Sequence, residues 1–180
     1  MKKTNNLKRF YGEDAVVDNS VLMDFFELNR LDILFKVFSS ITIADIVFEK
    51  EVLKEVKLAL EKYEFFRGQI ESREGFQIYI VLSENKKYEQ LSIPDKITVS
   101  IAGQNLCYCT SNDRLLRTAC IDLGVNLTGT LGILGCAIEL EIITQEEFNC
   151  LIEKLLSDKT SCFIAPKIVN EFVEEHEYGK

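Results

Sequence analysis

The chain of 180 residues has little of several residue types that mark particular classes of protein. It contains no tryptophan, two prolines, nine glycines and one histidine. The low content of glycine and proline excludes a collagen-like or low-complexity chain. The single histidine and the lack of any Cys-x-x-Cys pair argue against a zinc site.

Basic residues are also in the minority. The sequence has 21 Lys and Arg against 29 Asp and Glu, which gives a net charge of −8. A general basic surface that coats nucleic acid is therefore not expected, because phosphate binding needs a concentration of Lys and Arg. A nuclease stays compatible with this balance, since a carboxylate-rich metal site is itself negatively charged.

Long apolar runs are missing as well. No stretch approaches the roughly 20 residues of a membrane span, so no membrane segment is expected. Glu13, Asp14 and Asp18 interrupt the N-terminal region before the apolar core of a signal peptide could form. The six cysteines are not needed as disulfides in a chain of this size and apolar content. We therefore expect a cytoplasmic protein with free thiols.

What is present is the composition of one globular domain, with 47% hydrophobic and 28% charged residues. No repeat or linker divides the chain. We expect a loose polar N-terminal segment over residues 1–14 and a single domain over residues 15–180.

Short apolar strands alternate with helical patterns along the sequence. Strands are expected over residues 15–17, 41–43, 76–82, 106–109 and 125–127. Helices are expected over residues 20–28, 31–38, 47–66, 84–91, 97–103, 114–123, 130–140, 145–156 and 165–175. This alternation predicts an α/β fold: a three-layer α/β/α sandwich around a short, mostly parallel sheet.

Acidic residues recur where an expected strand ends and a helix begins. Asp18, Asp45 and Asp113 each follow a strand closely, and Asp95 stands at another helix start. Each acid alone is explained by helix capping, and Ser92-x-x-Asp95 has the form of a capping box. Taken together, Asp18 and Asp113 should emerge at one edge of a parallel sheet.

Carboxylates gathered at one edge repel each other unless a cation lies between them. Oxygen ligands suit hard divalent ions, so the expected cofactor is Mg²⁺ or Mn²⁺.

Four motifs in order resemble the PIN-domain family of ribonucleases. They are the strand and acid of residues 16–20 (VVDNS), the Leu-Ser-x-x-Asp pattern of residues 91–95 (LSIPD), the acidic turn of residues 109–114 (CTSNDR) and the Gly-Thr-Leu-Gly turn within residues 125–132 (VNLTGTLG). The Leu-Ser-x-x-Asp and Gly-Thr-Leu-Gly patterns are typical of one subgroup of toxin-like PIN proteins. The resemblance covers about residues 15–156.

The resemblance implies a site of four acids: Asp18, Glu51, Asp95 and Asp113. Asp18 and Asp113 would be the direct metal ligands, and Asp95 and Glu51 would complete the shell or hold a second ion. The second acid departs from the family pattern, since the residue three places after Val47 is Lys50. Glu51 is favoured because it lies one helical turn beyond Val47. Glu49 and Asp45 are the alternatives for this position.

The same motifs carry the polar residues expected to contact substrate: Ser20, Ser111, Asn112, Arg114 and Arg117. Arg114 and Arg117 would bind an RNA phosphate. A helical ion pair between Asp113 and Arg117 is the simpler alternative.

The resemblance implies a Mg²⁺- or Mn²⁺-dependent endoribonuclease that cleaves single-stranded RNA and leaves a 5′-phosphate. Many PIN proteins of this size are toxins of bacterial toxin–antitoxin pairs, so a small antitoxin and a homodimer are the further partners implied. The alternative is a catalytically degenerate PIN-like binding or interaction protein, which Lys50 and the net charge favour. A receiver-like phosphoacceptor domain is less suitable, because Asn19 follows Asp18 and no lysine occurs between residues 96 and 154.

Overall fold

A computed structural model describes residues 7–157, 160–162 and 164–175 of the chain. Residues 1–6 of the expected loose segment, like the lone His176, lie outside this described part. The remainder of that segment corrects the expectation, because Leu7–Phe10 form a 3-10 helix, η1. Phe10 is buried and stacks against the ring of Phe38, which ties this segment to the core.

The described residues form a five-stranded sheet, and every strand pair in it is parallel. The strands are β1 (Asp14–Val17), β2 (Ser40–Ala44), β3 (Phe66–Gly68), β4 (Tyr108–Thr110) and β5 (Leu127–Thr128). Their order across the sheet is β3-β2-β1-β4-β5. The central strands are almost fully buried, as expected for a parallel sheet with helices on both faces.

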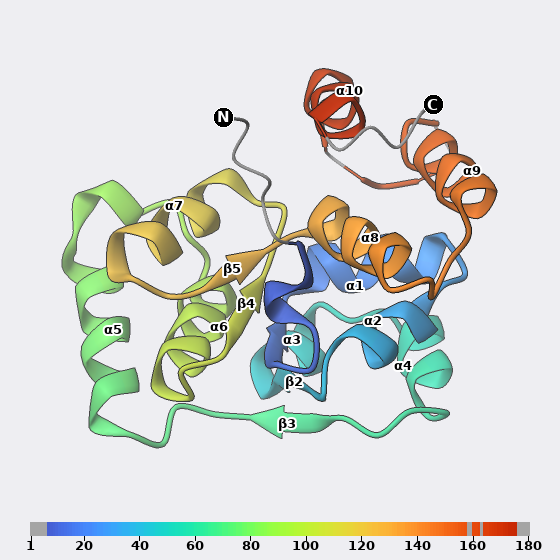
Figure 1. Ribbon diagram of the computed structural model, residues 1–180. Helices are drawn as coiled ribbons and strands as arrows, with labels where there is room; N and C mark the ends of the chain where they lie inside the picture. Colours follow the sequence, from blue (N-terminus) through green and yellow to red (C-terminus); the bar gives the residue numbers. More distant parts are fainter. Residues whose placement is uncertain (1–6, 158–159, 163, 176–180) are drawn as a thin grey trace.

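Helices cover the two faces of this sheet, which confirms the predicted three-layer α/β/α sandwich (Figure 1). They are α1 (Asn19–Glu27), α2 (Leu31–Val37), α3 (Asp45–Lys50), α4 (Lys54–Leu60), α5 (Arg73–Glu84), α6 (Ile93–Gln104), α7 (Arg114–Leu123), α8 (Thr130–Glu139), α9 (Gln145–Leu155) and α10 (Pro166–Glu175). One layer is built on α6, which packs against β1, β2 and β4 and is flanked by α5 and α7. In the other layer α1, α2 and α8 pack against each other.

The strand order creates a crevice between the carboxyl ends of β1 and β4. The chain leaves β1 toward β2 on one side of the sheet, whereas β4 lies on the other side. Open α/β sheets bind their ligands at such a switch point. Val17 pairs with Thr110 in the register of the two strands, so residues 18 and 111 enter this crevice side by side.

One expected strand is wrong. Residues 76–82 belong to helix α5, which begins where the Ser72 side chain accepts a hydrogen bond from the Gly75 amide. The apolar alternation suggested a strand, but Ile78 and Leu82 are also four residues apart, the spacing of one helix face. Gly103 allows α6 to approach this face, since a Cβ there would lie 2.3 Å from Ile78 Cδ1.

The helical assignment of this segment predicts unequal effects at two of its residues. Leu82→Ala should cost about 2–4 kcal/mol of unfolding free energy, because Leu82 is fully buried. Ile80→Ala should change it by less than about 0.5 kcal/mol, because that side chain is 49% exposed. Urea unfolding of both variants measures the difference. Equal losses would instead indicate one buried face, as in a strand.

Smaller differences from the sequence expectation lie at element boundaries. The segment expected as a helix or helix pair over residues 47–66 is the pair α3 and α4, and it ends in the unexpected strand β3. The short helix expected over residues 84–91 is only the 3-10 helix η2 (Lys86–Tyr88).

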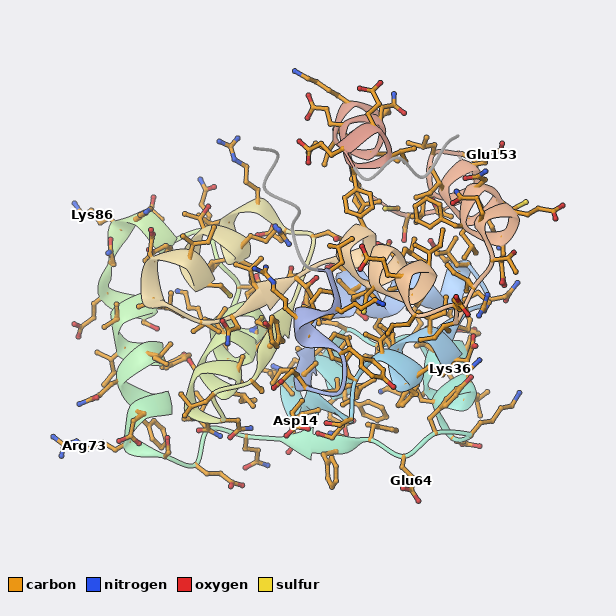
Figure 2. All side chains as sticks on the ribbon, in the orientation of Figure 1. Asp14, Lys36, Glu64, Arg73, Lys86 and Glu153 are labelled. Carbon is orange, nitrogen blue, oxygen red and sulfur yellow. The ribbon has the colours of Figure 1, made fainter. Side chains whose placement is uncertain are left out.

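The structure has the charged surface and the free cysteines that the composition predicts. Figure 2 shows charged side chains such as Arg73, Lys86 and Glu153 at the periphery of the molecule. All six cysteines are free. None of the helices in the described part combines the length and hydrophobicity that a membrane span needs.

Candidate functional site

Asp18 is a buried carboxylate at the centre of the crevice, directly after β1. Its side chain is 5% exposed and accepts hydrogen bonds from Ser20 Oγ at 2.6 Å and Ser111 Oγ at 2.9 Å, both on Oδ2. Asp18 occupies the N-cap position of α1, yet its side chain makes no capping hydrogen bond there. The capping explanation therefore does not account for this acid.

Asp18 and two further acids interact through their charges. Burial raises the pKa of the Asp18 carboxyl, the two hydroxyl hydrogen bonds oppose this, and the charge of Asp95 adds to the rise. The pKa of the half-buried Glu51 is raised by its burial and by the charges of Asp18 and Asp95. Asp18, Glu51 and Asp95 therefore form one electrostatic group, hereafter the acidic group. No Lys or Arg in the described part forms an ion pair with its members.

The two alternatives for the second acid face elsewhere. Asp45 Oδ1 lies 2.7 Å from Arg67 Nε, and Glu49 Oε1 lies 2.8 Å from Arg67 Nη2. Asp45 also accepts a hydrogen bond from the Gln69 side chain. Both carboxylates are thus occupied by residues at β3, whereas Glu51 lies within the field of Asp18.

Asp95 and Asp113 both serve as helix-capping residues in the structure. Asp95 forms the expected capping box with Ser92: its Oδ2 accepts from the Ser92 amide at 3.0 Å. Asp113 caps α7, since its Oδ1 accepts from the Leu116 amide at 2.7 Å. The Asp113 side chain is solvent-exposed, and its amide donates to Ser111 Oγ at 3.1 Å. Asp113 is therefore linked to Asp18 through Ser111.

The residues expected to contact substrate divide into three groups. Ser20 and Ser111 hold Asp18, as described above. Arg117 Nη1 donates to the Ser111 carbonyl at 2.9 Å, and the expected ion pair with Asp113 is not formed. Arg114 is exposed. Asn112 turns its side chain inward, toward a residue that the sequence analysis did not identify.

That residue is Asp24, a 2% exposed acid on α1. Its Oδ2 accepts from Thr130 Oγ1 at 2.6 Å, Asn112 Nδ2 at 2.7 Å and Cys162 Sγ at 3.5 Å. Asn112 Oδ1 in turn accepts from the Thr130 amide at 3.1 Å. The network joins α1, the turn after β4 and the start of α8. An acid beside Phe25, on the apolar face of a helix, was the available signal in the sequence.

A divalent cation fits the donor chemistry of the acidic group. Its members are carboxylates, and Asn19 Oδ1, next to Asp18 in the chain, is a buried oxygen without a hydrogen-bond partner in the described residues. No three His, Cys, Asp or Glu side chains in the described ranges lie close enough to hold one ion together. Mg²⁺ commonly needs only one or two carboxylates, because it keeps several waters and binds substrate phosphates.

The fold and the crevice define an α/β/α protein with a buried carboxylate at the switch point of a parallel sheet. A family model described as a PIN domain matches residues 14–178, and the chain belongs to that family. PIN domains are generally nucleases, and they generally use divalent metal ions. No curated protein matches the chain in sequence.

Proposed function

We propose that this PIN-domain protein is a Mg²⁺- or Mn²⁺-dependent endoribonuclease that cleaves single-stranded RNA. The observation that carries the proposal is the acidic group: the buried Asp18 interacts with the charges of Asp95 and Glu51, and no Lys or Arg among the described residues forms an ion pair with it. Burying an uncompensated carboxylate is costly, and a hard cation removes this cost.

In this proposal Asp18 is the direct metal ligand, with Glu51, Asp95 and Asp113 completing the site. When bound, the metal polarises a water molecule and stabilises the oxyanions of in-line attack on a phosphodiester. Ser20 and Ser111 hold the Asp18 carboxylate in one orientation. Arg114 and Arg117, on the adjacent α7, provide cations for the RNA backbone. Cleavage would leave a 5′-phosphate.

The cellular role that best suits this activity is that of a toxin in a toxin–antitoxin pair, acting in the cytoplasm. A small antitoxin and a homodimer are the partners proposed with it, on the strength of the family resemblance.

A catalytically inactive, RNA- or protein-binding PIN domain is the second candidate. It is favoured by Lys50 at the family's acid position and by the capping role of Asp113. The spacing of the acids supports it too, since no close set of three ligating side chains occurs in the described residues.

Cleavage of a labelled single-stranded RNA separates the two candidates. We expect cleavage with Mn²⁺ and none with EDTA. Glu51→Gln should weaken Mn²⁺ binding about tenfold or more and slow cleavage, because it removes one charge of the acidic group. Glu49→Gln is the matched control and should leave both unchanged, since Glu49 pairs with Arg67.

The opposite results have clear meanings. Equal effects of the two substitutions would mean that Glu51 is not the second acid of the site. No cleavage by the wild-type protein with either metal would favour the inactive binding protein.

A further inference from the structure

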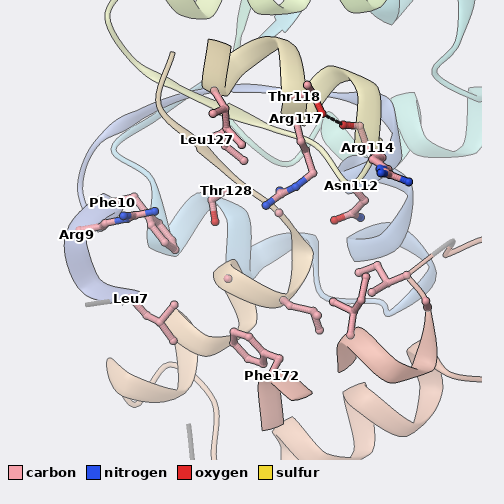
Figure 3. A pocket seen from close by; sticks show the side chains of 17 residues that line it. Leu7, Arg9, Phe10, Asn112, Arg114, Arg117, Thr118, Leu127, Thr128 and Phe172 are labelled. Atoms are coloured by element: carbon pink, nitrogen blue, oxygen red, sulfur yellow. Dashed lines mark hydrogen bonds between the residues drawn. The ribbon is translucent and has the colours of Figure 1, made fainter. Parts of the chain in front are cut away.

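A cavity of about 640 Å³ is lined by residues of η1, α7, β5, α8 and α10 (Figure 3). Asn112 contributes to its wall, and the preceding residue, Ser111, binds Asp18. The turn after β4 therefore contributes one residue to the cavity wall and, directly before it in the chain, one residue that binds Asp18. Its size is that of a small-molecule or nucleotide pocket.

The charge of this cavity is opposite to that of the protein as a whole. Arg9, Arg114 and Arg117 line it, and within the described part of the chain no carboxylate does. None of the three arginines forms an ion pair with a described residue. In a chain with eight more acidic than basic residues, three arginines around one cavity indicate an anion site.

Arg117 is the most constrained of these cations. Burial lowers the pKa of its guanidinium, because it partly removes the charge from water. Gly129 lies close to this guanidinium, because a Cβ there would lie 2.8 Å from Asn112 Oδ1 and 3.0 Å from Arg117 Nη1. Figure 3 shows Arg9 and Arg117 extending from opposite sides of Thr128. An anion between them would meet two guanidinium groups and a hydroxyl.

Most of the remaining cavity wall is apolar. Leu127, Ile168 and Phe172 line it, and Ile168 is 54% exposed. An apolar surface next to a cluster of arginines matches the two parts of a nucleotide, because bases pack between aromatic and other apolar side chains while phosphates bind guanidinium groups.

We propose that this cavity binds one nucleotide, its phosphate on Arg9 and Arg117 and its base against Ile168 and Phe172. The occupant that suits its position is the RNA nucleotide adjacent to the cleaved phosphodiester. This assignment of the source rests on the proposed function, whereas binding of a nucleoside phosphate does not. A free mononucleotide has the same chemistry and is the other source to be tested.

Calorimetric titration of the full chain with adenosine 5′-monophosphate, in EDTA, tests the cavity without the metal site. The monophosphate should bind more tightly than either adenosine or inorganic phosphate. Arg9→Ala should weaken its binding about tenfold, the loss of one charge-assisted contact. Arg73→Ala, an exposed arginine at the distant start of α5, is the matched control and should have no effect (Figure 2).

A second substitution separates the two halves of the pocket. Ile168→Ala should weaken binding of the monophosphate and adenosine but not of inorganic phosphate. Because Ile168 is exposed, this change should leave the fold intact. Adenosine binding as tightly as the monophosphate, with no effect of Arg9→Ala, would overturn the proposal.

The source of the nucleotide is read from a single-stranded RNA oligomer bound to the Asp18→Asn protein. Weaker RNA binding after adding Arg9→Ala identifies the RNA as the occupant. Unchanged RNA binding, with monophosphate binding still weakened by Arg9→Ala, identifies a free nucleotide. If Arg9→Ala changes neither RNA binding nor monophosphate binding, the cavity is not a nucleotide site. Monophosphate binding without any metal-dependent cleavage would instead contradict the proposed ribonuclease activity while still supporting the nucleotide site.

Discussion

Asp18→Asn is expected to weaken Mn²⁺ binding by at least about a hundredfold, the upper end of losses caused by changes around metal ligands. RNA cleavage should fall below detection. Asparagine keeps a side-chain oxygen that can accept from Ser20 and Ser111, so the change removes the charge and leaves the local hydrogen bonds. Calorimetric titration with Mn²⁺ and the cleavage of labelled RNA measure the two effects.

The matched control lies at the opposite end of the same strand. Asp14 is exposed and bonded to the hydroxyls of Ser39 and Ser40, so Asp14→Asn should bind Mn²⁺ and cleave RNA like the wild type. A stability measurement without divalent ions adds an independent readout. Because burial raises the pKa of Asp18, removing its charge should raise the melting temperature. Unchanged Mn²⁺ binding by Asp18→Asn would exclude this carboxylate from the metal site.

The position of Asp18 was predictable because it depends on topology alone. Short apolar strands separated by helices form a parallel sheet, and the carboxyl ends of parallel strands meet at one edge. The pairing of Val17 with Thr110 then brings residues 18 and 111 together. Local signals were equally decisive for α7, whose limits match the sequence expectation. Asp113 caps its beginning, and Gly124, at φ 68°, ends it in the left-handed conformation.

Other features depend on contacts that no local pattern contains. The alternation of residues 76–82 fits a strand face and, at Ile78 and Leu82, a helix face. Packing against α6 at Gly103 decides for the helix. The choice among Asp45, Glu49 and Glu51 depends on Arg67, which is distant in sequence and occupies the first two.

Asp24 is the clearest example of a residue hidden from sequence reasoning, and its two substitutions should differ strongly. Asp24→Ala is expected to be less stable than Asp24→Asn by about 2–4 kcal/mol. Alanine removes the buried acceptor of the Thr130 hydroxyl and of the Asn112 side-chain amide. Asparagine retains one oxygen that can accept from both. Urea unfolding of the two variants measures this difference, and equal stabilities would mean that the network contributes nothing.

The pH dependence of the same residue has a definite sign. Burial raises the pKa of the Asp24 carboxyl above its unfolded value. Its contribution to stability is therefore complete below the unfolded pKa and is lost as the pH rises through the folded pKa. Asp24→Asn lacks this titration, so it should gain stability relative to the wild type as the pH rises through that range. If the stability difference between Asp24→Asn and the wild type stayed constant over this pH range, the Asp24 charge would lie in a solvated environment.

The Asp24 network also reaches the proposed metal site. The backbone N–H of Asn112 donates to Ser20 Oγ at 3.3 Å, and the Ser20 hydroxyl donates to Asp18. Asp24→Ala should remove one of the hydrogen bonds that hold the Asn112 side chain, loosen Ser20 and lower Mn²⁺ affinity about tenfold, as for other residues that orient ligands. Asp24→Asn should retain the affinity because it retains the acceptor for Asn112. Asp24 is thus a positioning residue, acting on the metal only through two hydrogen-bonded neighbours.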